Sequence, residues 1–300
     1  MLAYNRKESE VISSKGIRVN SFIDKSASSN IDWTTVDSFG EEWNKFSDFS
    51  PEEIQKIGDE YFDIAKDKLS KESVVLEVGC GSGRWMNYLS DKVKFVEGID
   101  PSHSVISAAK FLSSKENIRV SQAEVEKIPF SDDSFDLVYS LGVLHHIPDT
   151  RKAMHRCVQK LKPGGYFLVY LYYKLDNRSI GFKSLFWLSN ILRRIICRLP
   201  SPIKGVVCDA LAILLYLPFV TLSKLFFAFD FSRPLVPHIP LSYYRDKTFN
   251  IIRNDSLDRF GTPLEQRFSK GEITDMMLSC GLKDIVFSEK EPYWHAIGRK

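Results

Sequence analysis

Short apolar runs and amphipathic segments alternate along the middle of the chain. Runs of five to seven mainly apolar residues predict five strands, over 74–78, 95–99, 118–122, 135–140 and 166–172. Helical spacing and helix start signals predict helices between them, over 84–89, 101–112 and 149–161. Strands that alternate with helices require right-handed crossovers, which makes the strands parallel and covers both faces of the sheet.

The C-terminal segment predicts one more helix and a pair of strands. A capping box over Ser269–Glu272 begins the helix, and Gly281 is suited to end it. Two apolar runs follow, 285–288 and 294–297, with too few residues between them for a parallel crossover. We therefore expect an α/β fold with a Rossmann-like, seven-stranded mixed sheet, an antiparallel last strand, helices on both faces and a helical insertion after the fifth strand.

These patterns divide the chain into four parts. Residues 1–50 form an N-terminal segment that is polar at first and then rich in aromatic residues. Residues 51–173 begin with a helix start at Ser50-Pro51 and contain the first five strands. Residues 174–268 form a mostly helical insertion, and residues 269–300 complete the core.

A glycine-rich turn follows the first of these strands. Glycines at 79, 81 and 83 lead directly into a helix, where backbone N–H groups can meet a ligand. A dinucleotide-binding turn would place its third glycine at position 84, which is Arg84, and this weakens a pyrophosphate interpretation. Asp100 ends the next strand, 21 positions after Gly79, where a carboxylate can accept from ribose hydroxyls. An ordinary strand–helix turn and a simple helix cap at Asp100 are the structural alternatives.

Five sequence blocks occur in a recognisable order. They are Val-Leu-Glu-Val-Gly-Cys-Gly-Ser-Gly (75–83), Gly-Ile-Asp (98–100), Ala-Glu-Val-Glu-Lys-Ile-Pro-Phe (123–130), Ser-Phe-Asp-Leu-Val-Tyr-Ser-Leu-Gly-Val-Leu-His-His-Ile-Pro-Asp (134–149) and Leu-Lys-Pro-Gly-Gly (161–165). In these blocks the chain resembles class I S-adenosylmethionine-dependent methyltransferases, and most closely the type 11 small-molecule branch that includes quinone C-methyltransferases. The resemblance implies S-adenosyl-L-methionine as the cofactor and a small molecule as the methyl acceptor.

The resemblance implies a cofactor role for eleven residues: Glu77, Gly79, Cys80, Gly81, Gly83, Asp100, Pro101, Glu124, Val125, Ser140 and Leu141. Glu77 matches the acid that holds the methionine ammonium group, and Asp100 matches the acid that binds ribose. Glu124 matches the residue that binds adenine N6, although the family commonly has the shorter aspartate there.

Methyl transfer from a sulfonium needs alignment and exclusion of water, and a base only if the nucleophile must lose a proton. His145 and His146 follow the fourth strand and are the candidate catalytic residues, because histidine titrates near neutrality. The structural alternative is that they cap the next turn or pack on a helix. Trp43 and Phe46 could cover the cofactor as part of an N-terminal lid, and plain packing of this segment is the alternative.

The insertion is both apolar and basic. Residues 180–235 contain seven Lys or Arg and two Asp. The fourteen-residue run Ala210–Ser223 has no charge, but Pro218 interrupts it, so we expect no membrane span, which needs about 20 apolar residues. Two interpretations stay open: a cap that forms the acceptor pocket, or peripheral membrane contact through 182–231. A lipid-linked acceptor would be compatible with both.

Composition narrows the other classes. The net charge of +3, and the absence of an Asn/Asp-Pro-Pro-Tyr motif after the fourth strand, argue against a nucleic-acid partner. Five scattered cysteines without a C-x-x-C, and no signal peptide, predict no metal site and a cytoplasmic protein, membrane-associated if the insertion touches lipid. A nicotinamide-dependent oxidoreductase and a non-catalytic cofactor-binding module remain the alternative functions. The acceptor, the methylated atom and the oligomeric state stay open.

Overall fold

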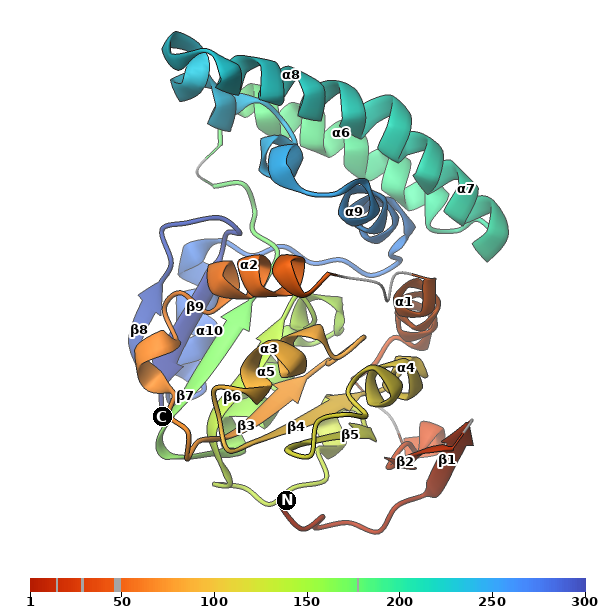
Figure 1. The fold of residues 1–300 in the computed structure, drawn as a ribbon, viewed down its shortest axis with the longest axis vertical. Helices are drawn as coiled ribbons and strands as arrows, with labels where there is room; N and C mark the ends of the chain where they lie inside the picture. Colours follow the sequence, from red (N-terminus) through yellow and green to blue (C-terminus); the bar gives the residue numbers. More distant parts are fainter. Residues whose placement is uncertain (15, 28–29, 46–49, 177) are drawn as a thin grey trace. The chain divides into compact units, whose positions relative to one another are not determined.

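The structure is a computed structural model that describes residues 1–300 except 15, 28–29, 46–49 and 177. It divides into two compact units. One unit, Met1–Asp176 with Leu264–Lys300, contains the sheet, and the other, Asn177–Pro263, contains helices without strands among its described residues (Figure 1). The helical unit falls within the insertion that the sequence predicts over 174–268.

The sheet has nine strands in the order β1-β2-β5-β4-β3-β6-β7-β9-β8. The strands are β1 (Glu10–Ser14), β2 (Ile17–Ser21), β3 (Val74–Val78), β4 (Phe95–Asp100), β5 (Ile118–Gln122), β6 (Phe135–Leu141), β7 (Leu161–Tyr170), β8 (Lys283–Phe287) and β9 (His295–Arg299). Strands β2 to β7 pair in parallel, whereas β9 is antiparallel to both β7 and β8. The antiparallel last strand is therefore confirmed.

The expected number of seven strands is wrong. All seven expected strands are present as β3 to β9, and an N-terminal hairpin, β1–β2, adds two more beyond β5. Strand β2 pairs with β5 at Asn20–Ser121 and Ser21–Gln122, and Ser21 Oγ donates to Gln122 Oε1 at 2.8 Å. Because the hairpin is polar apart from a few residues, its own sequence pattern does not predict strands. Its place in the sheet depends on pairing with β5, which lies about 100 residues further along the chain.

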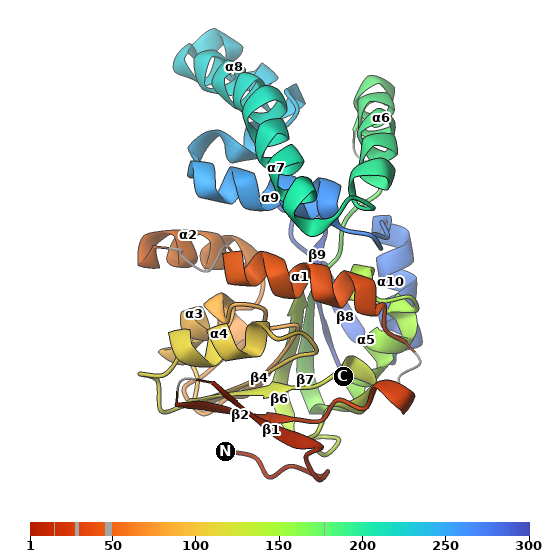
Figure 2. The same ribbon diagram turned by 90° about the vertical axis from the view of Figure 1, so that its right-hand side faces the viewer.

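Among its described residues, the sheet unit has six α-helices: α1 (Trp33–Lys45), α2 (Pro51–Tyr61), α3 (Arg84–Ser90), α4 (Ser104–Phe111), α5 (Thr150–Gln159) and α10 (Lys270–Ser279). Figure 2 shows α3 and α4 on one face of the sheet and α5 and α10 on the other. Helix α2 packs on α3, and α1 packs on α4. Short helical turns η1 (Lys25–Ala27), η2 (Lys66–Lys68), η3 (Val125–Lys127) and η4 (Leu144–His146) complete the unit.

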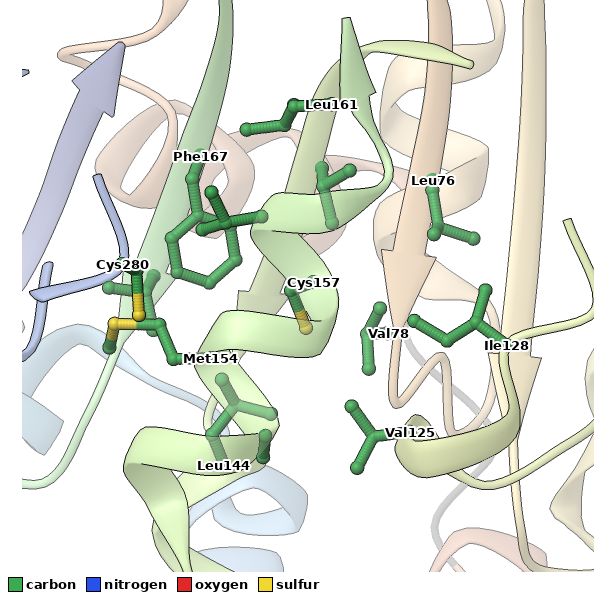
Figure 3. Packing of buried hydrophobic residues seen from close by; sticks show 14 of the residues in the cluster. Leu76, Val78, Val125, Ile128, Leu144, Met154, Cys157, Leu161, Phe167 and Cys280 are labelled. Atoms are coloured by element: carbon green, nitrogen blue, oxygen red, sulfur yellow. The ribbon is translucent and has the colours of Figure 1, made fainter. Parts of the chain in front are cut away.

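The main apolar core lies between the sheet and α5. Leu76 and Val78 of β3 and Phe167 of β7 pack with Met154 and Cys157 of α5 (Figure 3). All five side chains are buried, and burial of apolar area is the main favourable term in folding. This core holds the carboxyl ends of the parallel strands in place, which is the edge where open α/β sheets bind ligands.

The helical unit contains α6 (Ile180–Ile196), α7 (Ser201–Leu211), the π-helical turn η5 (Ala212–Tyr216), α8 (Leu217–Ala228), η6 (Asp230–His238), η7 (Ser242–Asp246) and α9 (Phe249–Gly261). Helix α9 packs on α6 and α7, while α8 packs on η6 and η7. Helix α6 and the long α7–α8 helix diverge from the turn that joins them (Figure 2).

The expectation that Pro218 interrupts the apolar run is wrong. One continuous helix of 28 residues, Ser201–Ala228, passes through it, and its length and composition would suffice to cross a membrane. Pro218 stands in the first turn of α8, directly after the π-helical turn. A π turn shifts the hydrogen bonds to a wider spacing, and such a turn can accommodate a proline that would clash within a regular helix.

Candidate active site

The turn after β3 is left-handed at three glycines. Gly79, Gly81 and Gly83 have φ angles of 84°, 50° and 81°, a region in which an L side chain costs about 1–2 kcal/mol. A Cβ on Gly79 would lie 2.4 Å from Val143 Cγ2, and one on Gly83 would lie 2.6 Å from Leu112 Cδ1. Backbone conformation and packing therefore both require glycine here.

The Asp100 carboxylate joins this turn to the end of β4. Its Oδ2 accepts from the Gly81 N–H at 3.0 Å, and its Oδ1 accepts from the N–H and the hydroxyl of Ser102 at 2.9 and 2.6 Å. Burial raises the pKa of Asp100, and these hydrogen bonds oppose that rise. A carboxylate can accept about four hydrogen bonds, so Asp100 keeps capacity for a ligand hydroxyl.

A pocket that is open to solvent at its mouth lies against the turn. Eight of the eleven cofactor residues predicted from the sequence line it: Gly79, Cys80, Gly81, Asp100, Pro101, Glu124, Val125 and Leu141. The other three, Glu77, Gly83 and Ser140, do not belong to its lining.

Those three residues support the pocket wall from within the fold. Glu77 is buried, and its Oε2 accepts from the Tyr139 hydroxyl at 2.8 Å. Ser140 Oγ donates to the Val78 carbonyl oxygen at 2.8 Å, and Gly83 is the N-cap of α3. Burial raises the pKa of Glu77 well above its usual range, although the Tyr139 hydrogen bond and the Arg84 charge oppose it. A cationic ligand group would offset part of this cost.

Helix α1 forms a further wall of the pocket. Thr35, Phe39 and Trp43 line it together with the turn. The Trp43 ring lies 3.1 Å from the position that a Cβ on Gly81 would take. The Arg84 guanidinium lies 4.7 Å from the Trp43 ring centroid and 4.6 Å from a ring of Trp85, so one cation joins α1 to α3. Phe46, the other aromatic residue of the expected lid, lies outside the described residues.

Polar contacts anchor the start of α1 near the pocket. The Asn30 side chain accepts from the Asp149 N–H at 2.7 Å and donates to the Asp149 carbonyl oxygen at 3.0 Å. Asp32 Oδ1 accepts from the Thr35 N–H at 3.0 Å and so caps the helix. Sequence reasoning missed Asn30, Asp32 and Thr35, which all line the pocket. The Asp-x-x-Thr pattern at 32–35 was a local signal for this helix start.

The two candidate histidines lie in different surroundings. His146 lines the pocket, whereas His145 is fully buried and does not. His146 Nδ1 lies 2.6 Å from the Leu264 carbonyl oxygen, which can only accept, so Nδ1 carries the hydrogen and Nε2 is the basic nitrogen of the neutral ring. His145 Nδ1 accepts from the Tyr172 N–H at 3.4 Å, and burial lowers the pKa of His145 well below its usual value.

Aromatic rings continue from the pocket along the strand ends. Phe39 lies 4.7 Å from His146 between ring centroids, and the His145 ring stacks on Tyr172 at 3.9 Å. Tyr61 contacts both Trp85 and Tyr170, at 5.4 and 5.2 Å. Pocket walls rich in aromatic side chains favour an apolar or planar ligand.

The pocket fits an adenosine-containing methyl donor. Asp100 offers a carboxylate for a ribose diol, and Gly79 and Gly81 bring the backbone of the turn to the pocket lining. Glu124 is buried in the lining, with its Oε1 2.9 Å from Lys127 Nζ, and can accept from an adenine amino group. Among the residues that the structure describes, no cluster of three His, Cys, Asp or Glu side chains is placed to hold a metal ion.

Comparison with known proteins identifies the domain that carries this pocket. The model of the type 11 methyltransferase family, described as a methyltransferase domain, matches residues 76–169. An uncharacterized methyltransferase, YcgJ of Bacillus subtilis, is 35% identical over 109 residues, which are 35% of this chain and 43% of that protein. Its crystal structure superposes with a TM-score of 0.47 at 20% identity, covering 77% of this chain and 70% of the other.

Two relatives with more specific names match the chain over a similar number of residues. Sterol 4-C-methyltransferase strm-1 of Caenorhabditis elegans is 33% identical over 107 residues, 34% of this chain and 32% of that protein. Ubiquinone biosynthesis O-methyltransferase of Alkalilimnicola ehrlichii is 34% identical over 97 residues, 31% of this chain and 39% of that protein. The chain thus spans about two fifths or less of these relatives' length. Over residues 76–169 it carries a methyltransferase domain of the S-adenosylmethionine-dependent type 11 family.

Proposed function

We propose that this protein transfers the methyl group of S-adenosylmethionine to a small acceptor that is apolar or lipid-linked. One observation carries the proposal: the glycine turn, Asp100 and His146 line the same pocket. The turn and Asp100 are the donor side of this arrangement, and His146 with its aromatic neighbour Phe39 is the acceptor side.

S-adenosylmethionine supplies a methyl group that is already activated by a positive sulfur. The protein's own residues then have three tasks. Asp100 accepts from the ribose hydroxyls while the Gly81 and Ser102 donors hold it in place. Glu77, buried beside Arg84 and Tyr139, favours the cationic amino-acid end of the donor. Helix α1, with Phe39 and Trp43, excludes water from the transfer.

His146 is the proposed general base for an acceptor that must lose a proton. Its Nδ1–H donates to the Leu264 carbonyl oxygen, which directs basicity to Nε2. His145 is assigned a positioning role, because it is buried and neutral and accepts from the backbone of Tyr172. Of the two candidate catalytic histidines, we therefore propose only His146 for the proton transfer.

The acceptor class rests on two supports. The pocket walls include Phe39, Trp43, Trp85 and Ile147, which suit an apolar molecule. Relatives named for ubiquinone biosynthesis and for sterols match about a third of this chain.

We also propose a cytoplasmic location, because the described cysteines are free thiols and four of the five are buried.

Calorimetric titration with S-adenosylhomocysteine tests the donor site. We expect binding by the wild type, at least tenfold weaker binding by Asp100→Asn, and unchanged binding by Asp91→Asn, whose side chain is exposed at the far end of α3. Stabilisation by NAD and not by S-adenosylhomocysteine would instead support an oxidoreductase. Transfer of a radiolabelled methyl group to a prenylated hydroxyquinol, but not to its tail-free analogue, is the expected result for the acceptor class.

A further inference from the structure

The exposed large apolar side chains gather in the helical unit. Of the 22 that the structure records, 17 lie between residues 180 and 249. They include Ile180, Trp187, Val206, Leu214 and Phe231, which are 83%, 65%, 71%, 75% and 87% exposed. This many exposed apolar side chains in one unit indicate a partner surface, because soluble proteins seldom leave large apolar surface open to water.

The long helix Ser201–Ala228 is apolar on its outside and more polar on its inside. Its buried positions recur every three or four residues and are mostly polar or small: Lys204, Cys208, Ala212, Tyr216, Val220 and Ser223. Its exposed large apolar side chains are Ile203, Val206, Ile213, Leu214, Leu222, Leu225 and Phe227, and Lys224 is the one exposed charged side chain among its described residues. A helix surrounded by water shows the opposite distribution.

The interior of the unit contains a polar network that holds these helices together. Tyr216 and Tyr244 both donate to the Asp255 carboxylate, the former at 2.6 Å. Arg253 of α9 forms a two-point contact with Asp209 of α7, at 3.0 and 2.8 Å. Arg253 and Asp255 of α9 are therefore used in contacts within the unit, while most large aliphatic side chains of α7–α8 are left outside.

Positive charge accompanies the apolar surface. Lys183, Arg194 and Arg198 are exposed on and after α6, and Lys224 is exposed on α8. Among the described side chains of residues 180–235, none of the exposed ones is acidic. Apolar side chains flanked by Lys and Arg complement a membrane surface that contains anionic lipids.

The same packing argues that the long helix lies along a membrane rather than across it. Arg253 and Asp255 of α9 are bonded to Asp209 of α7 and Tyr216 of η5, so α9 accompanies the long helix over α7 and η5. A spanning orientation would carry these charged groups into hydrocarbon, which is costly. A helix in the plane of the interface keeps α9 on the water side and places the apolar side in lipid.

We infer that the helical unit Asn177–Pro263 is a monotopic anchor that inserts the exposed faces of α6 and α7–α8 into an anionic phospholipid surface. The inference rests on the proposed function in one respect only: it names the surface from which an apolar acceptor would reach the enzyme. Membrane binding itself requires no methyl transfer.

Vesicle flotation of the full chain tests this anchor. The vesicles contain phosphatidylcholine with one quarter phosphatidylglycerol, or phosphatidylcholine alone. Leu214→Glu and Trp187→Glu each place a charge on the apolar surface, at positions where the side chain already faces solvent. Leu278→Glu is the matched control, because Leu278 is 54% exposed on α10 of the sheet unit. S-adenosylhomocysteine binding is measured on every variant.

We expect the wild type and Leu278→Glu to float with anionic vesicles, and each anchor variant to lose at least tenfold in partitioning while it still binds S-adenosylhomocysteine. Replacing Arg194, Arg198 and Lys224 by Gln should weaken binding to anionic vesicles more than to neutral ones. Equal flotation of all variants, or no flotation of the wild type, would overturn the anchor. The anchor would also be overturned if the wild type formed a dimer in solution, did not bind vesicles, and dissociated on the Leu214→Glu substitution. Flotation without S-adenosylhomocysteine binding would refute the proposed function and leave the anchor standing.

Discussion

Replacing Gly81 by alanine tests whether the left-handed turn is the donor site. Gly81 has a φ of 50°, and an added Cβ would lie 3.1 Å from the Trp43 ring of α1. The left-handed backbone alone costs an L residue about 1–2 kcal/mol. The contact with Trp43 adds a second effect, because the ring must move by a few tenths of an ångström and so shift a wall of the pocket.

Gly164→Ala provides the matched control. Gly164 has a φ of 81°, yet a Cβ there would meet nothing within 4 Å, and the residue lies outside the pocket lining. Both variants should therefore lose similar stability, about 2–8 °C in melting temperature for about 1–2 kcal/mol. Only Gly81→Ala should also lose affinity for S-adenosylhomocysteine, by at least tenfold.

Differential scanning fluorimetry and calorimetric titration on both variants give the two readouts. Unchanged S-adenosylhomocysteine binding by Gly81→Ala would refute the assignment of this turn to the donor. An equal loss of binding by Gly164→Ala would show that the effect is general destabilisation and not displacement of Trp43.

Three further results are expected. Asp100→Asn should melt lower than the wild type, because it replaces an acceptor of three buried hydrogen bonds by a group that is partly a donor; a melting temperature equal to that of Asp91→Asn would contradict this. His146→Ala should slow methyl transfer to a hydroxyl acceptor by about 10²–10⁴-fold. His145→Gln should mainly remove the loss of stability that the wild type shows below pH 6.5, where His145 is neutral in the folded protein and takes up a proton on unfolding. Loss of rate in the His145 variant alone would show the opposite assignment. Glu77→Gln should raise the melting temperature at pH 8 and not at pH 4, because burial raises the pKa of Glu77 and its stabilising protonated form is lost as pH rises. The same variant should bind S-adenosylhomocysteine more weakly, and tighter binding would exclude a role of Glu77 toward the ammonium group.

Local sequence patterns predicted most of the donor side of the site. The strand, the glycine turn, the following helix and Asp100 lie within 27 residues, and each of them is specified by neighbours in the chain. Eight of the eleven cofactor residues that the family resemblance implies line the pocket, and four of these, Pro101, Glu124, Val125 and Leu141, lie outside the 27 residues. Glu77 and Ser140 do not, because each makes a hydrogen bond to a neighbouring strand, Glu77 with Tyr139 and Ser140 with Val78, that the resemblance does not specify.

The sequence by itself determined the five parallel strands of the core, the antiparallel last strand and the turn that meets the donor, because periodicity and turn residues act over short distances. Only the tertiary structure decided that the N-terminal hairpin extends the sheet, that α1 closes the pocket over Gly81, and that His146 rather than His145 faces it. Only the tertiary structure also revealed that the helix around Pro218 is continuous and turns its apolar side outward. These features depend on contacts between residues far apart in the chain, and a local pattern records which residues are apolar but not which face they present.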